Sequence, residues 1–222
     1  MEKPILFNTE MVRAILDGRK TQTRRLIRPQ PEGQLSYIMC GSNPGKWDYM
    51  SASEAKVWDV EESRICKHDD GRLWTPPCHT DDLLYVRETW FYESHMEDLT
   101  AGKPDLPSGR YKHRYVYYAD HPDYPVHVGV GATGWRPSIH MPKEAARIWL
   151  KVTKVSVQRL QEITNDDAKA EGVTCATDNS GMMHRHKFRV LWDSITDTQT
   201  SWEANPWVWV IDFERLEGKH DD

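Results

Sequence analysis

Three well-separated segments of the chain carry the apolar patterning of β-strands. Residues 83–91, with the sequence LLYVRETWF, and residues 207–216, with the sequence WVWVIDFERL, point successive side chains to opposite faces. Residues 148–157 are rich in β-branched side chains. The alternation in the last segment gathers four apolar side chains on one face: Trp207, Trp209, Ile211 and Phe213. Tryptophans in a strand can stack bases, but alternating aromatic residues in strands more often belong to a core, so we interpret these residues as core.

Two helices are predicted in the connections between the strands. Thr164 can cap the first, with Asp167 at the capping-box position and Gly172 directly after Glu171 as its stop. Residues 184–195 have an apolar stripe at helical spacing. Short strands joined by a few helices predict an α+β fold, a small mixed β-barrel with flanking helices.

Two stretches have little periodicity and many Gly, Pro and charged residues. They cover about residues 29–79 and 92–134, although residues 111–119 inside the second read as an aromatic strand. A chain of 222 residues fits one domain. We therefore interpret residues 1–222 as a single domain with two long loop insertions.

The first insertion contains residue types that bind zinc, namely Cys66, His68, Cys78 and His79. Their pattern, Cys-x-His followed by an adjacent Cys-His, is not a familiar structural-zinc spacing. We therefore favour the alternative, in which the cysteines act as isolated small hydrophobic residues and the histidines are exposed. The sequence has no Gly-rich phosphate loop and no Rossmann or Walker pattern. We predict no metal site and no cofactor.

A basic segment follows the first predicted helix. Residues 9–17 form an amphipathic helix that Asn8 or Thr9 can cap, and Gly18 stands where a helix commonly ends. Between residues 11 and 30 there are six basic residues and one acid, Asp17. A basic run beside a helix C-terminus is often a solvated face. Hydroxyls interleaved with Lys and Arg also suit phosphate, sugar or base edges.

The conformation of this segment decides which side chains act together. A turned segment would put Lys20 and Thr23 on one side. An extended segment would instead separate two sets of side chains onto opposite faces: Thr21, Thr23 and Arg25 on one, and Lys20, Gln22 and Arg24 on the other.

The charge of the whole chain limits the kind of partner. A formal net charge of -5 argues against a general binder of duplex DNA, which normally presents a broad basic surface. Contact with nucleic acid should therefore be local, with one nucleotide or a short single strand. No apolar run approaches the ~20 residues of a membrane span. We predict no membrane partner, a cytoplasmic location and reduced cysteines. The sequence gives no oligomeric state.

Four segments in order resemble the ASCH domain family, in particular the long ASCH proteins carried by phages and prophages. They are the helix with GRKTQTRR, the LYVRETW strand, the LQEIT…AEGV segment and the final NPWVWVIDF strand. The resemblance covers about residues 4–28, 81–90 and 135–216. It implies a PUA-like β-barrel with a cleft suited to RNA or a modified nucleoside.

The resemblance also implies catalytic residues. The family includes small bacterial amidohydrolases that remove the acetyl group from acetylcytidine, and other members reported as ribonucleases. The Lys and second Thr of the amidohydrolase motif match Lys20 and Thr23, and its Arg matches Arg25. The catalytic Glu matches Glu171. These enzymes are shorter than this chain and lack its insertions.

We therefore expect a nucleoside- or RNA-directed hydrolase, most concretely an amidohydrolase acting on an acylated cytidine. The alternatives are a non-catalytic module that binds RNA or a modified base, and a ribonuclease. Thr23 would be the nucleophile, Lys20 its base and Glu171 a proton shuttle or water-orienting group. These three should converge in one concave pocket, with Lys20 and Thr23 exposed there. The expected substrate-binding residues are Arg19, Arg24, Arg25, Arg87 and Glu88.

The last two of these residues lie on opposite faces of the strand at residues 83–91. A charge on each face of an otherwise apolar strand needs a partner or a pocket. Arg87 and Glu88 could line the wall of the cleft, or they could form ordinary surface ion pairs at the strand end.

Overall fold

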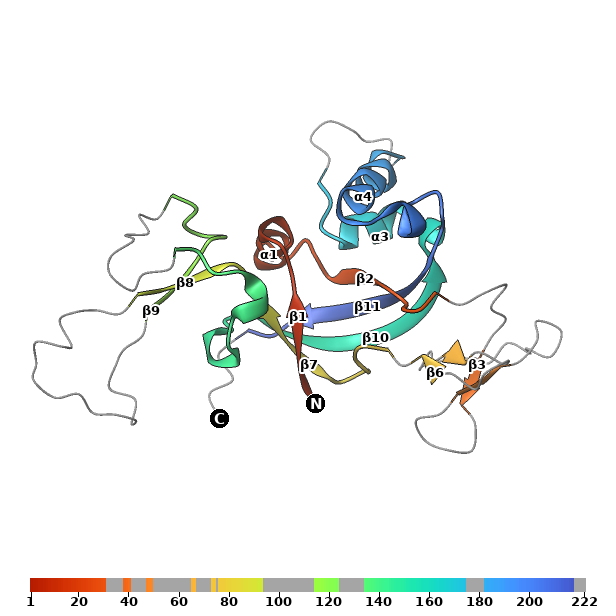
Figure 1. The fold of residues 1–222 in the computed structure, drawn as a ribbon, viewed down its shortest axis with the longest axis horizontal. Coiled ribbons are helices and arrows are strands. Elements are labelled where there is room, and N and C mark those ends of the chain that lie inside the picture. Colours follow the sequence, from red (N-terminus) through yellow and green to blue (C-terminus); the bar gives the residue numbers. More distant parts are fainter. Residues whose placement is uncertain are drawn as a thin grey trace, which may run out of the picture.

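A five-stranded mixed sheet forms the centre of the computed structural model (Figure 1). β1 (Glu2–Leu6) lies parallel to β7 (Leu83–Arg87). β10 (Trp149–Arg159) is antiparallel to both β7 and β11 (Trp207–Arg215), and β2 (Gln22–Leu26) is antiparallel to β11. The strand order is therefore β1-β7-β10-β11-β2, and the two N-terminal strands occupy opposite edges. The three strands expected from their patterning lie in this one sheet.

The structure describes residues 1–30, 76–93, 114–123, 134–174 and 182–217, with the backbone of four short strands. Those strands are β3 (Ile38–Cys40), β4 (Trp47–Tyr49), β5 (Ile65–Cys66) and β6 (Leu73–Trp74), which pair as β3-β4 and β5-β6. The extents of the two insertions stay predictions.

The edges of the main sheet do not pair with each other in the described ranges, so the sheet is not a closed barrel. A side-chain contact links them: Arg25 on β2 donates from Nη2 to the carbonyl oxygen of Leu6 on β1 at 2.7 Å. The predicted α+β class is confirmed, whereas the closed barrel is wrong for the strands that the structure describes.

Helices flank the sheet where capping residues predict them. α1 (Thr9–Leu16) begins after Asn8, whose side chain accepts a hydrogen bond from the Met11 amide. α3 (Asn165–Ala170) begins at the Thr164–Asp167 capping box. The other helices in the described ranges are α4 (Met182–Ile195) and four short 3-10 helices, η1 (Ser138–His140), η2 (Lys143–Ala145), η3 (Leu160–Glu162) and η4 (Thr198–Thr200). No helix among the described residues is long and apolar enough to cross a bilayer.

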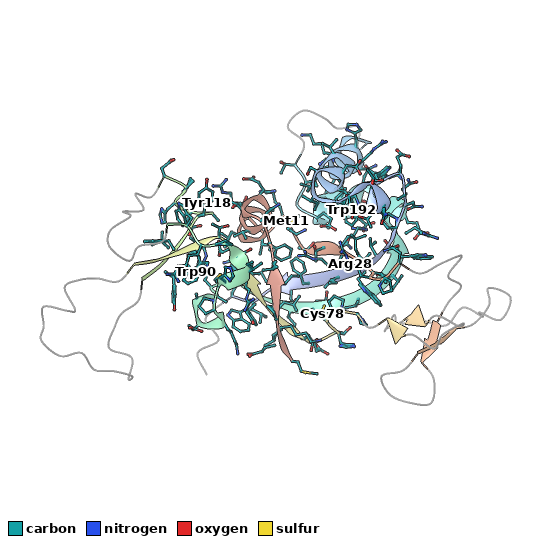
Figure 2. All side chains as sticks on the ribbon, viewed as in Figure 1. Met11, Arg28, Cys78, Trp90, Tyr118 and Trp192 are labelled. Atoms are coloured by element: carbon teal, nitrogen blue, oxygen red, sulfur yellow. The ribbon has the colours of Figure 1, made fainter. Side chains whose placement is uncertain are left out.

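Both faces of β11 are buried, each in a different core. Trp209, Ile211 and Phe213 belong to the core that also contains Val12 and Ile15 of α1. The opposite face packs against α3 and α4 above β2, where Figure 2 labels Trp192. That second core includes Val208, Val210, Phe188, Trp192 and Trp202. The interpretation of the strand tryptophans as core is confirmed.

The strand predicted at residues 83–91 is interrupted in the structure. β7 ends at Arg87, and β8 (Trp90–Glu93) forms a separate hairpin with β9 (Arg114–Tyr117). The break occurs at Glu88, whose amide contacts the Met141 sulfur at 3.3 Å instead of continuing the ladder. The prediction of one continuous strand was wrong because alternation alone does not reveal where a strand changes partner.

Candidate functional site

The end of α3 is packed tightly against the start of β2. Lys20 and Glu171 form an isolated antiparallel bridge, and the Thr21 amide donates to the Ala170 carbonyl at 2.8 Å. Gly172 has φ +86°, and a Cβ placed on it would lie 2.7 Å from the Ala14 Cβ and 3.0 Å from the Lys20 Cβ. This position therefore needs glycine for both its backbone conformation and its space. The close approach brings Glu171 onto Lys20.

Lys20 and Glu171 form a buried ion pair. The Lys20 Nζ lies 2.6 Å from the Glu171 Oε2, and the exposed fractions of the two side chains are 0% and 4%. The same Nζ donates to the carbonyl oxygens of Gln22 at 2.8 Å and Glu171 at 2.9 Å. Three acceptors match the three N–H donors of an ammonium group. Burial lowers the pKa of Lys20, and the Glu171 carboxylate opposes that change.

Arg24 shares the same carboxylate. Its Nη1 lies 3.3 Å from the Glu171 Oε1, and its Nη2 lies 3.3 Å from the Asp167 Oδ2. The guanidinium carbon is 5.9 Å from the centre of the Phe188 ring. Both oxygens of Glu171 thus face a cation. We name Lys20, Arg24 and Glu171 the ion cluster.

Thr23 lies on the opposite face of β2 from Gln22 and Arg24, because the segment is extended. It stands directly across from Ile211 in the ladder with β11. Its hydroxyl has no hydrogen-bond partner among the described residues. The structure thus joins Lys20 to Glu171 but records no contact between Thr23 and either of them.

The expected exposure of Lys20 and Thr23 was wrong. Each residue has an exposed fraction of only 2%. Lys20 is covered by the backbone and side chain of Glu171 at the end of α3. Thr23 lies within a strand whose opposite and flanking positions, Ile211 and Arg24, are also buried.

A pocket of about 410 Å³ opens between the two unpaired sheet edges. We name it the β1–β2 pocket. Its floor includes Trp209 and Ile211 of β11, and Arg25 reaches it from the face of β2 that also carries Thr23. The described residues that line it are Pro4, Ile5, Leu6, Arg25, Leu26, Arg28, Pro77, Cys78, Leu84, Trp209 and Ile211. The lining is mainly apolar, with two arginines.

The predicted binding arginines of the basic segment differ in their surroundings. Arg19 is exposed, pairs with Asp17 at 2.7 Å and donates to the Gly172 carbonyl at 3.0 Å. Arg24 belongs to the interior ion cluster. Arg25 lies over the Phe7 ring, with its guanidinium carbon 5.1 Å from the ring centre. Burial lowers the pKa of Arg25, and Glu171 opposes that change.

Arg87 and Glu88 contact residues that do not belong to the ion cluster. Arg87 donates to the Ile139 carbonyl at 3.3 Å and lies over the Tyr85 ring. Glu88 pairs with the Arg147 Nε at 2.9 Å, and burial raises the pKa of its carboxyl group. No contact joins either residue to the ion cluster within the described ranges. Glu88 therefore has a partner, and the pair is partly buried: the Glu88 side chain is buried, whereas that of Arg147 is 24% exposed.

Two polar residues of the site were not singled out from the sequence. Gln22 accepts a hydrogen bond from the Arg24 Nη1 and donates to Asp212 at 2.6 Å. Asp167 was predicted as a capping residue only, although it also pairs with Arg24. The alternation of Lys20, Gln22 and Arg24 was the available signal for this polar face.

The residues considered for zinc are only partly described. Cys78 is buried, and burial raises its pKa to about 12. The His79 Nδ1 lies 3.8 Å from the Asp82 Oδ2. The Cys66 side chain and His68 lie outside the described residues. No group of three potential metal ligands occurs in the part of the chain that the structure describes.

Comparison of the chain with protein-family models, with curated proteins and with solved structures found no match. The function is therefore inferred from the chemistry of the site and from the resemblance of its motifs.

Proposed function

We propose that this protein is a nucleoside- or RNA-directed hydrolase of the ASCH type, with a PUA-like fold, that removes an acyl group from a modified cytidine. One observation carries the proposal. Lys20 and Glu171, which are 151 residues apart, meet in a buried ion pair next to the strand that holds Thr23. The resemblance assigns catalytic roles to these same three residues.

The proposed reaction is acyl transfer to Thr23 followed by hydrolysis. The Thr23 oxygen attacks the amide carbon and loses its proton to the neutral form of Lys20. The bond to the exocyclic nitrogen then breaks, and that nitrogen leaves as a neutral amine after taking the proton back. Water hydrolyses the resulting ester, which releases the carboxylic acid and restores the threonine hydroxyl.

The environment of Lys20 supports its role as a base. Burial lowers its pKa, so its ammonium loses a proton at a lower pH than a solvated lysine does. Glu171 holds the protonated form in place. A neutral Lys20 would give up one of its three hydrogen bonds, and its lone pair could then accept the proton of Thr23.

The β1–β2 pocket supplies a place for the nucleobase. Its volume of about 410 Å³ lies within the range of ~300–1,000 Å³ common for small-ligand sites. Apolar walls would cover the faces of the base, and Arg25 would donate hydrogen bonds to its carbonyl oxygen. Because Thr23 and Arg25 share one face of β2, a base held by Arg25 would lie near the nucleophile.

The test is turnover of acetylcytidine, read by mass spectrometry. The wild type should release acetate and cytidine, and Thr23→Val and Lys20→Met should each reduce the rate by at least ~100-fold. Lys154→Gln is the control, since Lys154 is exposed on β10 and does not line the β1–β2 pocket. An inactive wild type that stays folded, or a fully active Thr23→Val, would overturn the proposal.

A non-catalytic binding module is the second candidate, and the saturation of the ion cluster favours it. All three donors of the Lys20 ammonium and both oxygens of Glu171 already have partners. Such a module would use the β1–β2 pocket to bind a modified base and would return it unchanged. Binding of acetylcytidine without any change of mass would favour this second function.

A further inference from the structure

Within the described ranges, the arginines of the β1–β2 pocket have no acidic partner in an ion pair, in contrast to Arg24 and Arg147. Arg24 pairs with Glu171 and Asp167, and Arg147 pairs with Glu88 and Asp120. Arg25 makes no ion pair within 4.0 Å in the described part of the chain, and its side chain is partly buried. Its guanidinium donates to a backbone carbonyl and lies over the Phe7 ring instead. Arg25 is therefore a partly exposed cation that can still take an external anion as its ion-pair partner.

Arg28 adds a second cation at the solvent edge of the same pocket. It is exposed, and among the described residues it has neither an ion pair nor a hydrogen bond. Arg28 and Asp197 interact electrostatically, but they form no ion pair within 4.0 Å. No Asp or Glu of the described residues lines the pocket. Two arginines without an acid contrast with the net charge of -5 of the whole chain.

The cavities beside α3 differ because the cations that line them already have acidic partners. A cavity of about 240 Å³ beside Glu171 is lined by Arg19 but also by Glu10. Another, of about 360 Å³, is lined by Arg19, which pairs with Asp17, and by Lys169, which pairs with Asp166. Arg19 and Lys169 are thus balanced by ion pairs, unlike Arg25 and Arg28.

We propose that the β1–β2 pocket binds a phosphorylated nucleoside rather than a free one. Its apolar floor at Trp209 and Ile211 takes the base, and Arg28 at the edge takes the phosphate. This inference rests on the proposed function for the choice of a nucleoside, while the phosphate follows from the arginines. A guanidinium suits this role because its planar donors match phosphate oxygens. The phosphate can belong to a free nucleotide or to an RNA strand.

Calorimetric titration at two salt concentrations tests the proposal with four probes: cytidine, cytidine 5′-monophosphate, inorganic phosphate and a short cytidine-containing oligoribonucleotide. The monophosphate should bind at least ~10-fold more tightly than cytidine, as expected for a charge-assisted contact. Its affinity should fall with salt, whereas that of cytidine should not. A strand that binds more tightly than the monophosphate identifies RNA as the source, and the reverse identifies the free nucleotide.

Arg28→Gln provides the decisive variant because Arg28 is exposed and the change should leave the fold intact. It should reduce the affinity for the monophosphate to near that of cytidine and leave cytidine binding unchanged. Lys154→Gln removes the same charge from an exposed position on β10 and should change neither affinity.

Two results would overturn the inference. One is equal binding of cytidine and its monophosphate, or an Arg28→Gln variant that keeps the full phosphate effect. The other is inorganic phosphate binding as tightly as the nucleotide, which would indicate an anion site without a base subsite. Deacylation of a free nucleoside could still occur in both cases. Neither result would therefore contradict the proposed hydrolase function, which the turnover assay tests separately.

Discussion

Removing the charge of Glu171 should destabilise the protein strongly. Glu171→Gln keeps the size of the side chain but leaves Lys20 and Arg24 without their shared counter-charge. Both cationic side chains have an exposed fraction of 0%. Breaking a buried ion pair by removing one partner costs about 3–5 kcal/mol. Globular proteins are stable by only about 5–15 kcal/mol, so this is a large loss.

Lys20→Met should cost less than Glu171→Gln because Glu171 keeps its second partner, Arg24. The variant still leaves the carbonyls of Gln22 and Glu171 without the donor that they share. We expect a loss of about 2–3 kcal/mol. The double variant should show a coupling energy of about 1–3 kcal/mol between the two positions.

Urea unfolding measures these losses, with an unchanged dependence on urea concentration as evidence that the folded state is intact. For a chain of this size, 3–5 kcal/mol lowers the melting temperature by roughly 6–20 °C. Lys169→Met is the control, because its ion pair with Asp166 is exposed and should contribute less than about 1 kcal/mol. Losses below about 1 kcal/mol at both Lys20 and Glu171 would refute the buried ion cluster.

Two further predictions concern α3. Gly172→Ala should cost about 2–4 kcal/mol of unfolding free energy, through its left-handed backbone and the clash with Ala14. Gly18 also has a positive φ, but a Cβ placed on it meets no atom within 4 Å. Gly18→Ala should therefore lower the free energy of unfolding less than Gly172→Ala, and the difference measures the clash. Equal losses for the two variants would argue against the clash. Although burial opposes it, hydrogen bonds at Thr164 lower the pKa of Asp167 below its usual 3.8. As pH falls, the unfolded chain therefore binds the proton before the folded chain does. The stability that the Asp167 carboxylate contributes is present above pH ~3.8 and is lost as pH falls below it. Between pH 6 and pH 3, the free energy of unfolding should therefore decrease less for Asp167→Asn than for the wild type.

Local patterns predicted the elements of the fold but not all of their partners. Asn8 and the Thr164–Asp167 box begin helices through contacts within three residues, so the sequence contains the whole cause. The break at Glu88 depends on Met141 and Arg147, which lie more than 50 residues further along. Spacing inside one strand cannot reveal such partners.

In the candidate site, too, the partners that lie far away in the sequence were the ones that local patterns did not predict. The meeting of Lys20 with Glu171 was expected through the resemblance, whereas the burial of the pair was not. A basic run after a helix is usually solvated, and nothing local indicates that α3 will cover it. Arg24 was interpreted as a binding residue for this reason, because its partners Glu171 and Asp167 come from more than 140 residues away.

The strand order has a consequence for how the chain folds. β1 and β2 are made first, but their neighbours in the sheet are β7 and β11, so β2 has no strand to pair with until the last strand is synthesised. Contacts between residues so distant in sequence slow folding, because the loops must close before the contacts form. A nascent chain that stops before β11 holds Lys20, Thr23 and Arg25 on an unpaired segment. The pocket, whose floor includes Trp209 and Ile211 of β11, therefore forms only in a chain that extends through β11.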